Sequence, residues 1–155
     1  MLLTEGWAIL RQARTAASTG KSQAAPRPWP RDNTEIESRV MKVVSHWKDI
    51  PATPVAMDGA KNAERRLVLG PDDGTPLMAL RVFTLAPGGH TPYHQHPFEH
   101  MNVVLEGRGL LRKADGEHRL GEGAMALVLP NELHQFRNAG DTDFSFVCLV
   151  PNGYA

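Results

Sequence analysis

The sequence lacks several features that mark large classes of protein. Its one cysteine, Cys148, excludes a disulfide within the chain and fits a reducing compartment. The 17 basic and 17 acidic residues balance to a formal net charge of zero without a basic run, which argues against nucleic acid or an anionic membrane surface as a partner. No apolar stretch approaches the roughly 18 residues that span a bilayer.

Residues 1–20 also lack the pattern of a secretory signal. They carry Glu5 and scattered arginines in place of a basic end, an apolar stretch and a cleavage site. We therefore expect a cytoplasmic protein. The chain has 155 residues, of which 41% are hydrophobic and 22% charged, which suits one globular domain with an extension.

We expect an N-terminal extension over residues 1–40 and a compact domain over residues 41–155. Residues 2–17 have the apolar side of a short helix, whereas residues 20–33 contain three prolines within five residues, which exclude a helix there. So short a helix is marginal alone. Docking on the barrel, docking on a partner subunit and disorder are open alternatives, and the functional chain could instead begin near Met41.

The compact domain shows short β-type runs separated by glycine, proline and aspartate turns. Strands at this spacing predict an all-β sandwich or barrel. The Asp115-Gly116 pair indicates the clearest hairpin. The expected strands are Arg39–Val44, Arg65–Leu69, Leu77–Leu85, Thr91–His96, Met101–Leu105, Gly109–Arg112, His118–Leu120, Ala124–Leu129, His134–Arg137 and Phe144–Val150.

Four histidines point to a metal site. His94, His96 and His100 lie close together in the chain, and His134 follows in a later strand candidate. Imidazole is the commonest metal ligand in proteins, and a His-x-His pair in extended backbone puts both rings on one face. We predict that these four side chains bind one divalent metal ion. Glu99 is the alternative to His100 as fourth ligand, although a straight strand would turn it to the opposite face.

The all-imidazole shell has chemical consequences. Four neutral ligands leave a divalent ion with its full charge, which favours an anionic ligand such as an enolate, catecholate or carboxylate. An octahedral ion would keep two positions free, enough for a chelating substrate or for a substrate oxygen and O₂. Without a thiolate, Mn, Fe, Co, Ni, Cu and Zn all stay possible.

Two spaced motifs resemble those of a known family. Residues 88–107 read G-x5-H-x-H-x3-H-x6-G, and residues 123–138 read G-x6-P-x3-H-x3-N. Both are similar to the motifs of small single-domain cupins with a four-histidine site, where His100 replaces the glutamate of most cupins. The resemblance covers residues 41–151 and implies a double-stranded β-helix, a jelly-roll barrel, usually paired as a homodimer. Pairing would also cover exposed sheet edges.

Three further residues are candidates for a substrate pocket. The resemblance puts one face of the last strand, with Phe146, Cys148 and Val150, inside the barrel near the metal. A buried cysteine is usually a small hydrophobe, although beside a redox metal it is prone to oxidation. Arg81 interrupts an apolar run, so it must face solvent, form an ion pair or hold an anion. We take Arg81, Phe146 and Cys148 as pocket candidates.

Two classes of function stay open. The first is a metal-dependent enzyme, most sharply a dioxygenase that uses O₂ to cleave a C–C or C=C bond of a small anionic enolic or phenolic molecule. A non-redox isomerase or lyase would use the same metal to stabilise an enolate. The second class is a small-molecule-binding or sensing module, because one barrel serves many chemistries.

Overall fold

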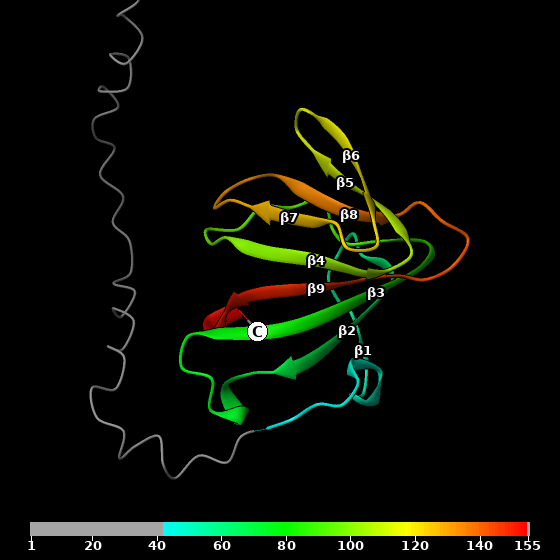
Figure 1. Ribbon diagram of the computed structural model, residues 1–155. Coiled ribbons are helices and arrows are strands. Elements are labelled where there is room, and N and C mark those ends of the chain that lie inside the picture. Colours follow the sequence, from blue (N-terminus) through cyan, green and yellow to red (C-terminus); the bar gives the residue numbers. More distant parts are fainter. Residues whose placement is uncertain (1–41, 155) are drawn as a thin grey trace, which may run out of the picture.

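The computed structural model describes residues 42–154 (Figure 1). The predicted helix over residues 2–17 and the linker over residues 20–33 lie outside this range. The described part is built from strands and three short 3₁₀ turns, η2 (Trp47–Asp49), η3 (Pro71–Asp73) and η4 (Asn152–Tyr154). The strands are β1 (Thr53–Pro54), β2 (Lys61–Leu69), β3 (Met78–His90), β4 (His100–Glu106), β5 (Arg108–Lys113), β6 (Gly116–Gly121), β7 (Met125–Val128), β8 (His134–Asn138) and β9 (Phe144–Pro151).

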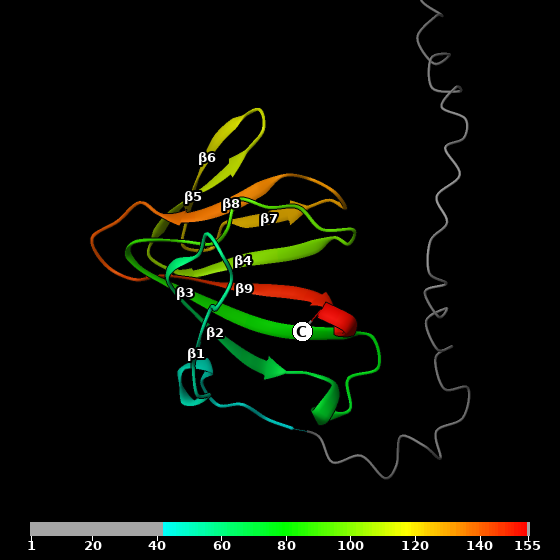
Figure 2. The same ribbon diagram turned by 180° about the vertical axis from the view of Figure 1, so that it is seen from behind.

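The strands form one antiparallel sheet that curves into a nearly closed barrel. Their order is β6-β5-β8-β3-β9-β4-β7, with β2 beside β3 and β1 beside β2 (Figures 1 and 2). The long strand β3 connects much of the sheet. It pairs with β2 and β9 along its length and reaches β8 through the His90–Arg137 pair. The all-β jelly-roll barrel predicted from the sequence is confirmed.

The hairpin predicted at Asp115-Gly116 is also confirmed. Strands β5 and β6 pair antiparallel down to Lys113 and Gly116, which leaves Ala114 and Asp115 as the turn. Figure 1 shows this hairpin projecting beyond the other strands. A short turn segment between two strand-like runs is therefore enough to predict the hairpin here.

Two predicted strands are wrong. Residues 42–44, the described part of the strand predicted at Arg39–Val44, have no strand structure. Residues 91–96 form a loop whose only pairing is an isolated bridge between His94 and His134. Pro92 and Pro97 bracket the two histidines of this loop and have no N–H to donate to a ladder, which explains why no strand forms.

Residues Pro87-Gly88-Gly89 fall between two of the expected strands, where a glycine and proline turn is predicted, but they lie within β3. Gly88 has a φ of +71°, and a Cβ on Gly89 would lie 2.6 Å from the carbonyl oxygen of Asn62. The pairing of β2 with β3 shifts register at this point. The glycines therefore make a bulge that bends β3 towards β8, with the backbone of β2 packed against it.

The barrel interior is filled mainly by apolar side chains, with three phenylalanines prominent. Phe136, Phe144 and Phe146 are almost fully buried; Phe136 stacks on Phe146, and Phe144 packs against Phe146 with its ring tilted. They belong to a core cluster that also contains Leu85 and Val104. No helix in the described range is long and apolar enough to cross a membrane.

Candidate metal centre

Three segments bring the four predicted histidines to one end of the barrel interior. His94 and His96 come from the loop between β3 and β4, His100 begins β4, and His134 begins β8. The backbones of His94 and His134 exchange two hydrogen bonds, of 3.1 and 2.9 Å. This bridge fixes the loop against β8, so both histidines of the loop reach the barrel without being in a strand.

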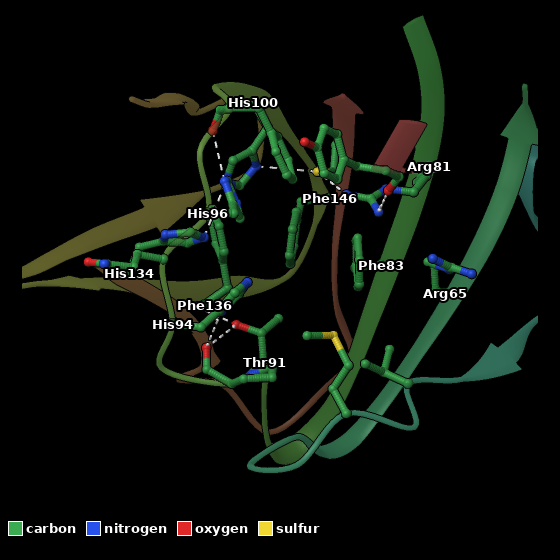
Figure 3. Close-up of a pocket in the computed structure, with 17 residues that line it drawn as sticks. Arg65, Arg81, Phe83, Thr91, His94, His96, His100, His134, Phe136 and Phe146 are labelled. Atoms are coloured by element: carbon green, nitrogen blue, oxygen red, sulfur yellow. Dashed lines mark hydrogen bonds between the residues drawn. The ribbon is translucent and has the colours of Figure 1, made fainter. Parts of the chain in front are cut away.

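Each of the four imidazole rings lies beside at least two of the others (Figure 3). One ring nitrogen from each of His94, His96 and His134 lies within 4.8 Å of the others. The Nε2 atom of His100 lies 3.2 Å from the Nε2 atom of His134, so His100 joins the same cluster. Glu99 is exposed and His100 is 5% exposed, which places the alternative fourth ligand outside the cluster.

For three of the four rings, a backbone carbonyl determines which nitrogen faces the cluster. A carbonyl oxygen only accepts hydrogen bonds, so an Nδ1 atom that contacts one carries the proton and leaves Nε2 with a free lone pair. Such contacts hold ligand histidines in place in metal sites. They join His94 to the carbonyl of Pro92 at 3.0 Å, His96 to that of Phe98 at 2.8 Å and His134 to that of Glu132 at 2.7 Å.

His100 is oriented by side chains instead. Its Nδ1 atom lies 3.2 Å from the amide oxygen of Asn102 and 3.3 Å from the sulfur of Cys148. The Asn102 amide nitrogen faces backbone carbonyls, so its oxygen accepts from the imidazole. The Nε2 atoms of His100 and His134 are then two acceptors at 3.2 Å. Such a pair is repulsive without a cation, and about 3 Å suits two nitrogens bonded to one ion at about 2.1 Å.

Burial favours the neutral form of three of these imidazoles. Burial first, and then the positive charge of neighbouring imidazoles, lowers the pKa of His100 to about 3 and that of His134 to about 4. The pKa of His96 is also lowered, again chiefly by burial. Because a metal ion binds the neutral form of imidazole, the cluster is ready to bind one at neutral pH. The residues present therefore fit a divalent transition metal.

The cluster opens on a cavity of about 430 Å³ with an aromatic wall. Phe136 stacks on Phe146 with ring centroids 4.4 Å apart, and Phe146 stacks on Phe83 at 5.6 Å. We call these three side chains the phenylalanine ladder. In Figure 3 the ladder lies between the histidines and the two arginines of the cavity. It offers a flat apolar surface beside the imidazoles.

The structure places the predicted pocket residues in different ways. Arg81, Phe146 and Cys148 line the cavity. Val150 instead packs against Cys148 and Ala79 in the adjoining core. Burial raises the pKa of the Cys148 thiol, which therefore stays protonated at neutral pH.

Arg65 and Tyr154 also line this cavity and were not predicted from the sequence. Arg65 shares its strand face with the buried Ala63, which is a signal that could have identified it. Tyr154 closes the cavity from η4 and stacks on Phe98 at 3.8 Å, while Phe98 stacks on His96 at 3.9 Å. No pattern in the sequence indicates that the C-terminal turn would return to the histidines.

A small jelly-roll barrel with histidines clustered inside one end is typical of one class of protein, and comparison with known proteins identifies the same class. The model of the cupin domain matches residues 81–150. The polyketide cyclase RemF from Streptomyces resistomycificus is 32% identical, with a TM-score of 0.68 over 72% of this chain and 80% of that chain. The chain belongs to the cupin family.

Other relatives differ in their activities. A 1-methylthio-D-xylulose 5-phosphate methylsulfurylase from Rhodospirillum rubrum is 33% identical over 79 residues, 46% of each chain. The chain thus matches less than half the length of this curated relative. A predicted oxalate decarboxylase from Thermotoga maritima is 21% identical, with a TM-score of 0.63 over 71% of this chain and 99% of that chain, and this likeness concerns the fold alone.

Proposed function

We propose that this chain is a metal-dependent enzyme that acts on a small enolic or phenolic molecule in its anionic form. The observation that carries the proposal is the cluster of four imidazoles with free Nε2 atoms beside the apolar cavity. His94, His96, His100 and His134 would hold one divalent transition metal. Such an ion supplies a Lewis acid that stabilises negative charge on a substrate oxygen.

Non-redox ring closure by formation of a carbon–carbon bond is the reaction with most support. The polyketide cyclase is similar over most of both chains. No carboxylate occurs among the described residues that line the cavity, so the chain offers no strong general base there. A 1,3-dicarbonyl or phenolic substrate loses a proton readily and therefore needs no strong general base. In an intramolecular aldol closure, the enolate carbon bonds to a carbonyl carbon, and the carbonyl oxygen takes up the proton that the first carbon lost.

The chain's own side chains would orient such a substrate. The phenylalanine ladder provides a stack against which a conjugated molecule can lie flat. The Phe98 ring, held between His96 and Tyr154, fixes one imidazole and covers it from water. Both effects favour a folded, desolvated substrate next to the histidines.

Oxygen-dependent cleavage, the prediction from the sequence, is the second candidate. The apolar wall of the cavity favours it, because such a wall keeps water from reactive intermediates. The Cys148 thiol counts against it, since the sulfur lies 3.3 Å from the Nδ1 atom of His100, where activated oxygen would oxidise it.

Turnover in air and under argon tests the proposal. Metal-loaded protein is incubated with a panel of 1,3-dicarbonyl and phenolic compounds, and the products are weighed by mass spectrometry. We expect equal rates in both gases and products with the substrate's mass, or that mass less one water. Products that contain both atoms of O₂ and form only in air would establish the second candidate. Binding without any turnover would favour a sensing module.

A matched pair of variants links turnover to the site. His134→Ala removes one imidazole of the cluster, and we expect it to abolish turnover. His118→Ala changes an exposed histidine on β6 that is not part of the cluster, and is expected to turn over normally.

A further inference from the structure

The cavity has a second polar region, on the wall formed by β2 and β3. Arg65 and Arg81 both line it there. In the register of the two strands, Arg65 pairs with Phe83 and Leu67 pairs with Arg81, so the two arginines lie on neighbouring strands two residues apart in register. Figure 3 shows them on the opposite side of the phenylalanine ladder from the histidines. We call Arg65 and Arg81 the arginine pair.

The arginine pair has no acidic partner in the described range. The cavity lining contains no aspartate or glutamate, and the ion pairs within residues 42–154 do not include Arg65 or Arg81. Burial and the positive charge of Arg81 lower the pKa of Arg65. Two guanidinium groups that share a partly buried cavity without a carboxylate repel each other and are costly to desolvate. A negative group from outside the described chain would balance them.

The hydrogen bonds of Arg81 leave part of its guanidinium unsatisfied. One terminal nitrogen donates to the backbone carbonyl of Tyr154 at 2.8 Å, and the other lies 3.3 Å from the sulfur of Cys148. The Nε atom is buried and has no partner in the described range. Buried donors are nearly always satisfied in native proteins, so an orphaned one indicates a missing partner such as a ligand.

The distance between the arginine pair and the histidines is short. The Cys148 sulfur lies 3.3 Å from both the Arg81 guanidinium and the Nδ1 atom of His100. The phenylalanine ladder runs between the same two regions, and the Arg81 guanidinium carbon lies 5.3 Å from the Phe83 ring centroid. A flat molecule of one or two fused rings is therefore long enough to touch both regions at once.

We propose that the arginine pair binds a carboxylate carried by the substrate at the end opposite to the oxygen that faces the histidines. This inference rests on the proposed function and narrows its substrate class to flat, conjugated molecules with two separated acidic groups. Arginine suits this role, because its planar fork pairs with the two oxygens of a carboxylate. The ladder then holds the rings between the two ends.

Two probes that differ only in the carboxylate test the proposal. 6-Hydroxy-2-naphthoate carries a phenol at one end and a carboxylate at the other, and 2-naphthol lacks the carboxylate. Binding is measured by fluorescence or calorimetry with the wild type, Arg65→Gln, Arg81→Gln, Arg81→Lys and, as control, Arg119→Gln, which changes an exposed arginine on β6.

We expect Arg65→Gln and Arg81→Gln each to weaken binding of the naphthoate by about tenfold or more and to leave 2-naphthol within about twofold. Arg81→Lys should lose part of the preference, because it keeps the charge without the fork. Equal losses for both probes, or no loss for the naphthoate, would overturn the proposal. Thermal melts show which variants stay folded, and Arg65→Gln decides the question if Arg81→Gln unfolds.

The same titrations on chelator-treated protein separate this inference from the proposed function. A preference for the naphthoate that depends on the arginine pair and survives without metal supports the anion site even if no turnover is ever found. Turnover of substrates that is indifferent to both arginine variants would leave the proposed enzyme standing and overturn the anion site.

Discussion

At the scale of single residues, the partners of Nδ1 decide what the histidines can do. Three carbonyl groups and one amide oxygen accept hydrogen bonds from the Nδ1–H groups, so every Nε2 lone pair is free towards the cluster. The sequence predicted which histidines gather but not this orientation, because the carbonyls belong to loop backbone whose course no pattern indicates. His100 depends in addition on Asn102 and Cys148, which a strand register brings together.

The identity of the fourth ligand is a prediction at this scale. His100→Ala should weaken metal binding by about tenfold or more, whereas Glu99→Ala should leave it unchanged, since the Glu99 side chain is exposed. Metal titrations of the chelator-treated variants measure both affinities. If Glu99→Ala loses the metal and His100→Ala keeps it, the assignment is wrong.

The cavity wall gives a second prediction. Phe146→Leu shortens the middle member of the phenylalanine ladder, which is 1% exposed. We expect the free energy of unfolding to fall by about 1–2 kcal/mol and the preference among flat substrates to change, with one metal per chain retained. Calorimetry, substrate profiles and metal analysis check the three parts. A loss of metal in this variant would show that the ladder supports the histidines rather than the substrate.

At the scale of elements, the turns carried most of the predictive signal. Strands that are bounded by glycine or aspartate turns, such as β5 and β6, were predicted within a few residues. The turn signal gave wrong predictions at prolines and glycines whose effect depends on how neighbouring strands pack. Pro92 and Pro97 keep the histidine loop out of the sheet, and Gly88 bulges β3 without ending it. Both effects depend on contacts with neighbouring strands, which a local pattern in one sequence does not reveal.

A glycine on β5 provides a prediction about packing. A Cβ on Gly109 would clash with the ring of Phe144, which is fully buried in the core. Gly109→Ala should therefore lower the free energy of unfolding by about 1–3 kcal/mol. Gly121→Ala on β6 is the control, because its Cβ would meet nothing within 4 Å. Denaturant titrations compare the two, and equal stability would mean that the Phe144 ring moves aside freely.

At the scale of the whole molecule, one outer face of the barrel is unusually apolar. Met101 on β4 pairs with Leu127 on β7, and Met125 and Leu129 lie on the same side; all four are between 47 and 78% exposed. Strand β7 is also the last strand in the sheet order. We keep the prediction that the domain over residues 41–155 forms a homodimer, and propose this face for the contact, because an apolar patch beside an open edge suits a second copy.

Light scattering at micromolar concentration tests the dimer. We expect the mass of two chains for the wild type and of one chain for Leu127→Glu, because a charge in an apolar contact is costly to bury. Val43→Glu, at a residue that is 76% exposed outside this face, should stay dimeric. A wild-type monomer would contradict the prediction.

The most direct measurement of the central claim is an anomalous difference map from crystals of the protein grown with Mn, Fe, Co, Ni, Cu or Zn. We predict one peak per chain, at about 2.0–2.3 Å from the Nε2 atoms of His94, His96, His100 and His134. The absence of a peak at this position with every metal, or a peak held by other residues, would contradict it.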